Sequence, residues 1–264
     1  TQVATKPVAS NFYIQGGDKY KKGDFKGAIA DYTEAIRQNP NYAYAYISRG
    51  VARFKLGDNK EAIADYNQAL RINPNYTNAY YNRGVARYGL GDKQGAIQDY
   101  NSALRMNPNF AYAYYNRGVA RYDLGDKQEA IADYNSALGI NPNYTNAYIG
   151  RGLARYGLGD KQGAIQDYNS ALRINPKDAL AYSNRGVARY GLGDNQEAIA
   201  DYTQALRINP NYTNAYYNRG VARANLRDKQ GGIADLQKAA DLYRQQGKTK
   251  DYQKTQELIK KFQQ

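Results

Sequence analysis

The spacing of the prolines restricts this chain to a repeated architecture. Six of its seven prolines are separated from one another by 34 residues, at Pro40, Pro74, Pro108, Pro142, Pro176 and Pro210. A fixed period of that length is typical of a repeat array, in which each unit buries its apolar face only against its neighbours. Placing each proline at position 32 of a unit gives repeats at 9–42, 43–76, 77–110, 111–144, 145–178 and 179–212, and a seventh without the proline at 213–246.

Each unit is predicted to contain two helices, at positions 1–14 and 18–31. A Gly-Asp pair recurs between them, at Gly57-Asp58, Gly91-Asp92, Gly125-Asp126, Gly159-Asp160 and Gly193-Asp194. The glycine can adopt the left-handed conformation that ends a helix, and the aspartate can accept from the first amides of the next one. Where a glutamate follows that aspartate by three residues, at Glu61, Glu129 and Glu197, a capping box is predicted. The proline ends the second helix, because the residue before it is displaced from the helical region.

Small residues and tyrosines recur at fixed positions of the unit. Glycine stands at position 8, at Gly50, Gly84, Gly118, Gly152, Gly186 and Gly220, and alanine at positions 20 and 27. A glycine inside a helix costs about 1 kcal/mol relative to alanine, so its return in every unit indicates a closely crossing neighbour. The tyrosines at positions 4 and 24 are predicted to fill the space around these contacts.

This pattern of an aromatic residue at 4, Gly at 8, Ala at 20, an aromatic residue at 24, Ala at 27 and Pro at 32 resembles the tetratricopeptide repeat. The resemblance covers residues 9–246, which leaves 1–8 as an N-terminal extension and 247–264 as an expected C-terminal capping helix. It implies an all-α fold, a right-handed superhelical α-solenoid of antiparallel helix pairs. It also implies a concave groove lined by positions 2, 5, 6, 9, 12 and 13 of the first helix of each pair. Proteins of this family usually bind other proteins and catalyse nothing.

Composition points the same way. The 264 residues include no His and no Cys, so thiol and imidazole nucleophiles, a histidine general base and thiolate or imidazole metal sites are excluded. We therefore expect a protein that is not an enzyme and has no cofactor and no bound metal. No apolar run is long enough to span a bilayer and no leader is visible, so we expect a soluble chain without membrane contact, its compartment left open.

Arginine fills two positions that usually hold apolar residues in this family. Position 7 is Arg49, Arg83, Arg117, Arg151, Arg185 and Arg219, and position 11 is Arg53, Arg87, Arg121, Arg155, Arg189 and Arg223. Position 23 is aspartate in every unit: Asp31, Asp65, Asp99, Asp133, Asp167, Asp201 and Asp235. Two interpretations follow: ion pairs along the helix interfaces, or a basic stripe that binds phosphate or acidic peptide.

The groove positions supply the candidate binding residues. Position 6 is Asn82, Asn116, Asn184 and Asn218; position 5 is Tyr81, Tyr115 and Tyr217; position 9 is Val85, Val119, Val187 and Val221; position 12 is Tyr88, Tyr122, Tyr156 and Tyr190. An asparagine amide both donates and accepts, so it can pair with a peptide group whatever side chain that residue carries. The row is similar to the asparagines that hold extended peptides in the O-linked N-acetylglucosamine transferases. The other interpretation is that these asparagines solvate a polar helix face.

One internal comparison favours a binding role for these positions. Units 77–110 and 145–178 differ at only six positions, and three of the six are positions 5, 6 and 9. We therefore predict a scaffold that binds an extended segment of a partner protein. Two alternatives stay open: nucleic-acid or other polyanion binding through the arginine rows, given the net charge of +13, and a self-assembling homo-oligomer. The tripeptides Asn75-Tyr76-Thr77, Asn143-Tyr144-Thr145 and Asn211-Tyr212-Thr213 fit a glycosylation acceptor, but they recur because the turn between units recurs.

Overall fold

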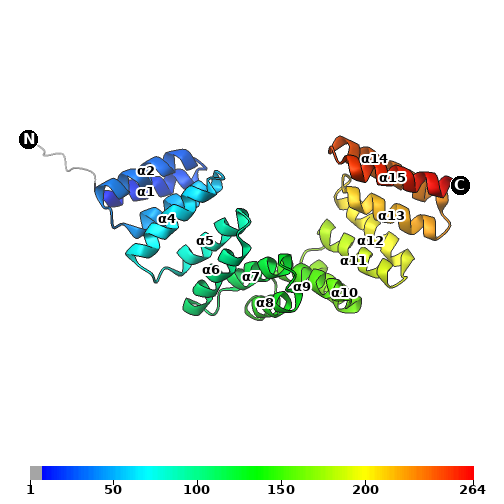
Figure 1. Cartoon of the computed structure of the whole chain (residues 1–264), viewed down its shortest axis with the longest axis horizontal. Helices are drawn as coiled ribbons and strands as arrows, with labels where there is room; N and C mark the ends of the chain where they lie inside the picture. Colours follow the sequence, from blue (N-terminus) through cyan, green and yellow to red (C-terminus); the bar gives the residue numbers. More distant parts are fainter. Residues whose placement is uncertain (1–7) are drawn as a thin grey trace, which may run out of the picture. The chain divides into compact units, whose positions relative to one another are not determined.

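The computed structural model describes residues 8–264, which form helices joined by short turns (Figure 1). Residues 1–7, most of the expected N-terminal extension, lie outside the described residues. The helices are α1 (Ala9–Lys21), α2 (Phe25–Gln38), α3 (Ala43–Lys55), α4 (Asn59–Ile72), α5 (Thr77–Gly89), α6 (Lys93–Met106), α7 (Ala111–Asp123), α8 (Lys127–Ile140), α9 (Thr145–Gly157), α10 (Lys161–Ile174), α11 (Ala179–Gly191), α12 (Asn195–Ile208), α13 (Thr213–Asn225), α14 (Lys229–Gln245) and α15 (Thr249–Gln263).

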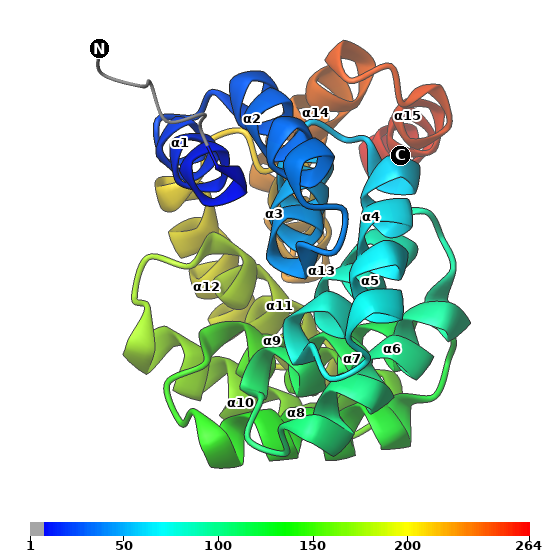
Figure 2. The same ribbon diagram turned by 90° about the vertical axis from the view of Figure 1, so that its left-hand side faces the viewer.

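The chain divides into two compact units. The first ends at Ile140 and contains α1 to α8, and the second runs from Asn141 to Gln264 and contains α9 to α15. Within each unit every helix packs against the one before it, and the first helices of successive repeats also meet, as α3 and α5 do (Figures 1 and 2). This arrangement places the first helices of a unit next to one another.

The turn inside each repeat has the predicted left-handed residue. Gly57 and Gly91 have φ values of 86° and 84°, and the amide of the following aspartate donates back to the end of the first helix, as from Asp58 N to Arg53 O. Arg227 takes the equivalent position before α14 with a φ of 68°. The same backbone contact, from Asp228 N to Arg223 O, closes that turn although arginine precedes the aspartate.

Two of the three predicted capping boxes, those that end at Glu61 and Glu197, are wrong. The side chains of Asp58 and Asp194, each followed at the third position by a glutamate, cap no amide. Asp92 instead accepts from the amide of Gly95 at 2.8 Å, and the same cap forms at the starts of α2, α10 and α14. A Cβ built on Gly95 would lie 2.1 Å from Asp92 Oδ2, so the position that Asp92 takes here requires glycine at residue 95. At the start of α11, however, Asp178 accepts from the amide of Ala181 at 2.9 Å, so a side chain at that position does not by itself exclude a cap.

The core consists of the predicted contacts between glycines and tyrosines. A Cβ on Gly84 would lie 2.7 Å from Cε1 of Tyr100, and the position-24 tyrosines of α4, α6, α8, α10 and α12 are only 1–2% exposed. In the last repeat Leu236 replaces the tyrosine, and a Cβ on Gly220 would lie 2.9 Å from both Cγ of Leu236 and the carbonyl oxygen of Gly232. Close helix crossing thus explains the glycine in every first helix.

The last helix covers the end of the second unit. α15 packs on α14, and Thr255 and Ile259 on this helix are buried. The rest of its surface is rich in lysine and glutamine.

Candidate functional site

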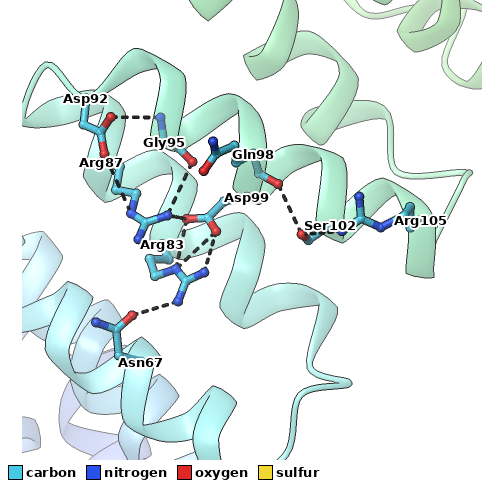
Figure 3. A network of polar contacts seen from close by, with 9 residues as sticks. All are labelled: Asn67, Arg83, Arg87, Asp92, Gly95, Gln98, Asp99, Ser102 and Arg105. Carbon is cyan, nitrogen blue, oxygen red and sulfur yellow. Dashed lines mark hydrogen bonds and ion pairs between the residues drawn. The ribbon is translucent and has the colours of Figure 1, made fainter.

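The first helices are held in register by ion pairs with the second helices. Asp99 on α6 is 2% exposed and accepts from two arginines of α5, from Arg83 Nη2 at 2.6 Å and from Arg87 Nη1 at 2.9 Å (Figure 3). Arg83 also donates from Nη1 to Oδ1 of Asn67, on α4 of the preceding repeat, at 2.8 Å. One arginine therefore joins three helices.

The same contacts recur along both units. Each of Asp65, Asp99, Asp133, Asp167, Asp201 and Asp235 accepts from both arginines of its repeat. Every position-7 guanidinium also lies over the position-4 tyrosine of its own helix, at 5.4 to 5.7 Å from the ring centroid. The first interpretation, ion pairs along the helix interfaces, is thus the one that the structure supports. All twelve arginines already face a carboxylate.

The predicted binding residues lie on the first helices beside these ion pairs. All fifteen of them are half-buried, so each has part of its side chain in the helix interface and part in solvent. None of them carries a charge. The face that they form within each unit is therefore neutral at these positions, although the chain as a whole is strongly basic.

The structure brings one predicted tyrosine and one predicted asparagine into direct contact. Asn116 Nδ2 on α7 donates to the hydroxyl of Tyr81 on α5 at 3.0 Å, and burial raises the pKa of this tyrosine. A weaker contact of the same kind joins Ser48 to Tyr13, with 3.3 Å between the two hydroxyl oxygens. The hydroxyl of a position-5 tyrosine can thus accept a hydrogen bond from the position-6 side chain of the next repeat.

The other three asparagines have no such tyrosine before them. The preceding position-5 residues are Ile47, Ile149 and Ser183. Consistent with this, Asn82, Asn184 and Asn218 make no side-chain hydrogen bond to any residue within 8–264, and Nδ2 of Asn184 is buried without a partner. The asparagine row is therefore divided into one engaged amide and three unengaged amides.

Four of the predicted residues line one small pocket. Val85 and Tyr88 of α5 and Asn116 and Val119 of α7 enclose about 60 Å³ together with the core residue Tyr100. The walls are mainly apolar and the one amide is already bonded to Tyr81. This pocket has the size and chemistry for a small aliphatic group.

Sequence reasoning missed the partners of the position-12 tyrosines. The hydroxyl of Tyr88 donates to Asp123, and Asn225 Nδ2 donates to the hydroxyl of Tyr190; each partner stands at position 13 of the next repeat. Burial and the hydrogen bond to Asp123 raise the pKa of Tyr88 to about 12. In each of these contacts the tyrosine and its partner are 35 residues apart in the sequence, as Tyr81 and Asn116 are. That spacing was the signal from which the partners could have been predicted.

Within residues 8–264 no cluster of His, Cys, Asp or Glu has the arrangement of a metal site. Among the helices of that same stretch, none combines the length and the apolar character needed to cross a membrane.

Family models for the repeat match most of the array. A model described as TPR repeat matches residues 16–57, 52–91 and 158–193, and two described as tetratricopeptide repeat match 81–145 and 179–212. No curated protein matches the chain over its sequence.

Solved structures share the fold. A tetratricopeptide repeat protein from Parabacteroides merdae is 23% identical with a TM-score of 0.73, over 94% of this chain and 98% of that one. MamA is 30% identical with a TM-score of 0.59, over 61% of this chain and 95% of its own. YrrB, a TPR protein with an unusual peptide-binding site, is 23% identical with a TM-score of 0.60, over 70% of this chain and 95% of its own. The all-α solenoid of paired helices is thereby confirmed, and the chain belongs to the tetratricopeptide repeat family.

Proposed function

We propose that this protein binds an extended segment of a partner protein along the neutral face of its first helices. The observation that carries the proposal is that the arginine side chains of those helices have partners within the protein, whereas most of the position-6 asparagine amides do not. The arginines are used by internal carboxylates, whereas Asn82, Asn184 and Asn218 keep unengaged amides beside exposed parts of valine and tyrosine side chains. The amides of these asparagines can therefore bind a ligand, because they form no hydrogen bond that stabilises the fold.

The chemistry of the face suits a peptide backbone. A primary amide offers two donors and an acceptor, which can pair with the C=O and N–H of one peptide group. The neighbouring valines and tyrosines supply apolar contact, and tyrosine does so with little loss of side-chain entropy. A buried donor without an acceptor, such as Nδ2 of Asn184, costs about 1 to 3 kcal/mol. The amides of Asn82 and Asn218 are not buried in this way, so they are the ones open to a bound segment.

Two further points support this proposal. Members of the family serve as scaffolds for protein interactions, and YrrB, which has the same fold, carries a peptide-binding site. The alternative of polyanion binding through the arginine rows loses its basis, because each of those arginines pairs with an aspartate.

The test compares two triple variants with the wild type. One variant carries Asn82→Ala, Asn184→Ala and Asn218→Ala. The control carries Asn109→Ala, Asn143→Ala and Asn211→Ala, which are exposed and lie in the turns between repeats. Both are checked for helical circular dichroism and then used to capture proteins from nuclease-treated lysate of the source cells.

We expect the wild type and the control to retain the same proteins and the first variant to lose them. Retention of one set by all three proteins would contradict the proposal. Sedimentation at several protein concentrations tests the remaining alternative, which is self-assembly. A mass that grows with concentration would favour a self-assembling protein.

A further inference from the structure

A pocket lies in the first unit, where the second and third repeats meet. It encloses about 310 Å³ and is lined by Tyr44 and Ile47 of α3, residues 75–78 and Asn107. Residues 75–77 are one of the three tripeptides that resemble a glycosylation acceptor. We call this site the Tyr44–Asn78 pocket.

Two tyrosine rings form one wall of the pocket. The ring centroids of Tyr44 and Tyr76 are 5.0 Å apart and the ring planes are inclined by 59°. Tyr44 is 54% exposed, although it is a large and mainly apolar side chain, and the neighbouring Tyr76 raises its pKa. The wall therefore presents aromatic surface to solvent in a fixed arrangement.

Amides face the same space. The side chains of Asn75 and Asn78 make no hydrogen bond to the described part of the chain, and both residues are exposed. The amide oxygen of Asn107 accepts from the backbone of Asn109 at 3.1 Å, which leaves its two donors for other partners. No lysine, arginine, aspartate or glutamate lines the pocket. Its chemistry is that of a neutral ligand with an apolar ring and hydrogen-bond acceptors.

We propose that the Tyr44–Asn78 pocket holds a proline of the bound segment, with the flanking residues in the polyproline II conformation. This inference rests on the proposed peptide binding and names the residue type that the peptide carries. A proline ring packs on aromatic faces, as in the known recognition of proline-rich segments by aromatic-lined grooves. Polyproline II carbonyls have no internal partners, so they match the free donors of Asn75 and Asn78. The segment is already extended, which lowers the entropy lost on binding.

The chain itself supplies a matched substitution for the wall. Leu180 stands at position 2 of the sixth repeat, the same position as Tyr44, and it is 46% exposed on a regular helix. Tyr44→Leu thus keeps an apolar side chain that this helix position tolerates and removes only the ring. Asn78→Ala removes one amide, and Asn109→Ala removes an exposed asparagine that does not line the pocket.

The experiment measures binding of two fluorescein-labelled probes by anisotropy: decaproline, and a glycine-serine peptide of the same length. We expect decaproline to bind the wild type and Asn109→Ala equally. Its affinity should fall about tenfold in Tyr44→Leu, as expected for the loss of an aromatic contact, and also fall in Asn78→Ala. The glycine-serine peptide should bind at least tenfold more weakly than decaproline. NMR shifts caused by decaproline should centre on the amides of residues 75–78.

Three results would overturn the inference: no binding of decaproline to the wild type, unchanged affinity in Tyr44→Leu, or shifts centred elsewhere. The variant with Asn82→Ala, Asn184→Ala and Asn218→Ala distinguishes a failure of this inference from a failure of the proposed function. If partner proteins still depend on Asn82, Asn184 and Asn218 while decaproline does not bind, peptide binding stands and the proline preference is wrong. If capture of partners does not depend on those asparagines, the proposed function fails.

Discussion

Arg83 holds Asp99 by two parallel contacts, from Nη2 to Oδ1 at 2.6 Å and from Nε to Oδ2 at 3.0 Å. The aspartate is almost fully buried, whereas the arginine keeps 16% of its side chain exposed. A fork of this kind fixes orientation as well as distance, because the planar guanidinium must align with the carboxylate. The pair therefore sets how the first and second helices of the repeat meet.

Replacing this aspartate should destabilise the first unit strongly. Asp99→Asn leaves Arg83 without a carboxylate and leaves Arg87 only the exposed Asp92, 3.9 Å from its Nε. Breaking a buried ion pair costs about 3 kcal/mol. The measurement is the free energy of unfolding in urea. Asp241→Asn is the control, because Asp241 is 56% exposed and its pair with Arg244 should be worth about 0 to 1 kcal/mol. Equal effects of the two substitutions would show that burial does not decide the strength of these pairs.

Two glycines in helices should respond in opposite directions to alanine. Gly84→Ala places a Cβ 2.7 Å from the Tyr100 ring, so it should destabilise the protein by about 1 to 3 kcal/mol. Gly139→Ala meets no atom within 4 Å and lies in the last turn of α8, so it should stabilise by about 0.5 kcal/mol. Thermal unfolding followed by circular dichroism measures both. A stabilising Gly84→Ala would contradict the close crossing of the helices.

The helix caps give a second matched pair. Asp92→Ala removes a side chain that accepts from the Gly95 amide and should cost about 1 kcal/mol. Asp58→Ala removes a side chain that caps nothing and should cost clearly less. The two urea midpoints test this directly. Equal losses would mean that Asp58 caps its helix in solution, as the capping-box pattern predicts.

Alkaline pH should weaken the fold through its buried tyrosines. Burial raises the pKa of Tyr100 above the ordinary 10, and that of Tyr88 to about 12. Below pH 10 these tyrosines are protonated in the folded and in the unfolded chain, so their contribution to the free energy of unfolding does not change with pH. Above pH 10 the unfolded chain loses these protons first, and the free energy of unfolding therefore falls between pH 10 and 12.

Tyr100→Phe should make that fall less steep while leaving stability near pH 7 almost unchanged, because the Tyr100 hydroxyl makes no hydrogen bond to the described residues. Urea unfolding at several pH values from 7 to 12 measures the slope. An identical slope in wild type and variant would mean that Tyr100 does not titrate differently on unfolding.

Local chemistry and the 34-residue period were enough to predict much of this protein. Proline stops, left-handed glycines and helix periodicity act over a few residues, so they place the helices from sequence alone. The pairing of Arg83 and Arg87 with Asp99 was one of two interpretations that the repeated charges allowed, and the structure supports it.

The tertiary structure decided the features that depend on contacts between repeats or on steric detail. Whether an asparagine is engaged depends on a side chain 35 residues earlier, so Asn116 is bonded to Tyr81 while Asn184 follows Ile149 and is not. Which aspartates cap their helices was also decided there, since Asp92 and Asp178 accept from an amide three residues later and Asp58 does not. The Tyr44–Asn78 pocket exists only because the turn between two repeats folds beside the preceding first helix. Such contacts depend on exact distances between helices, and a sequence pattern fixes only which positions come near one another.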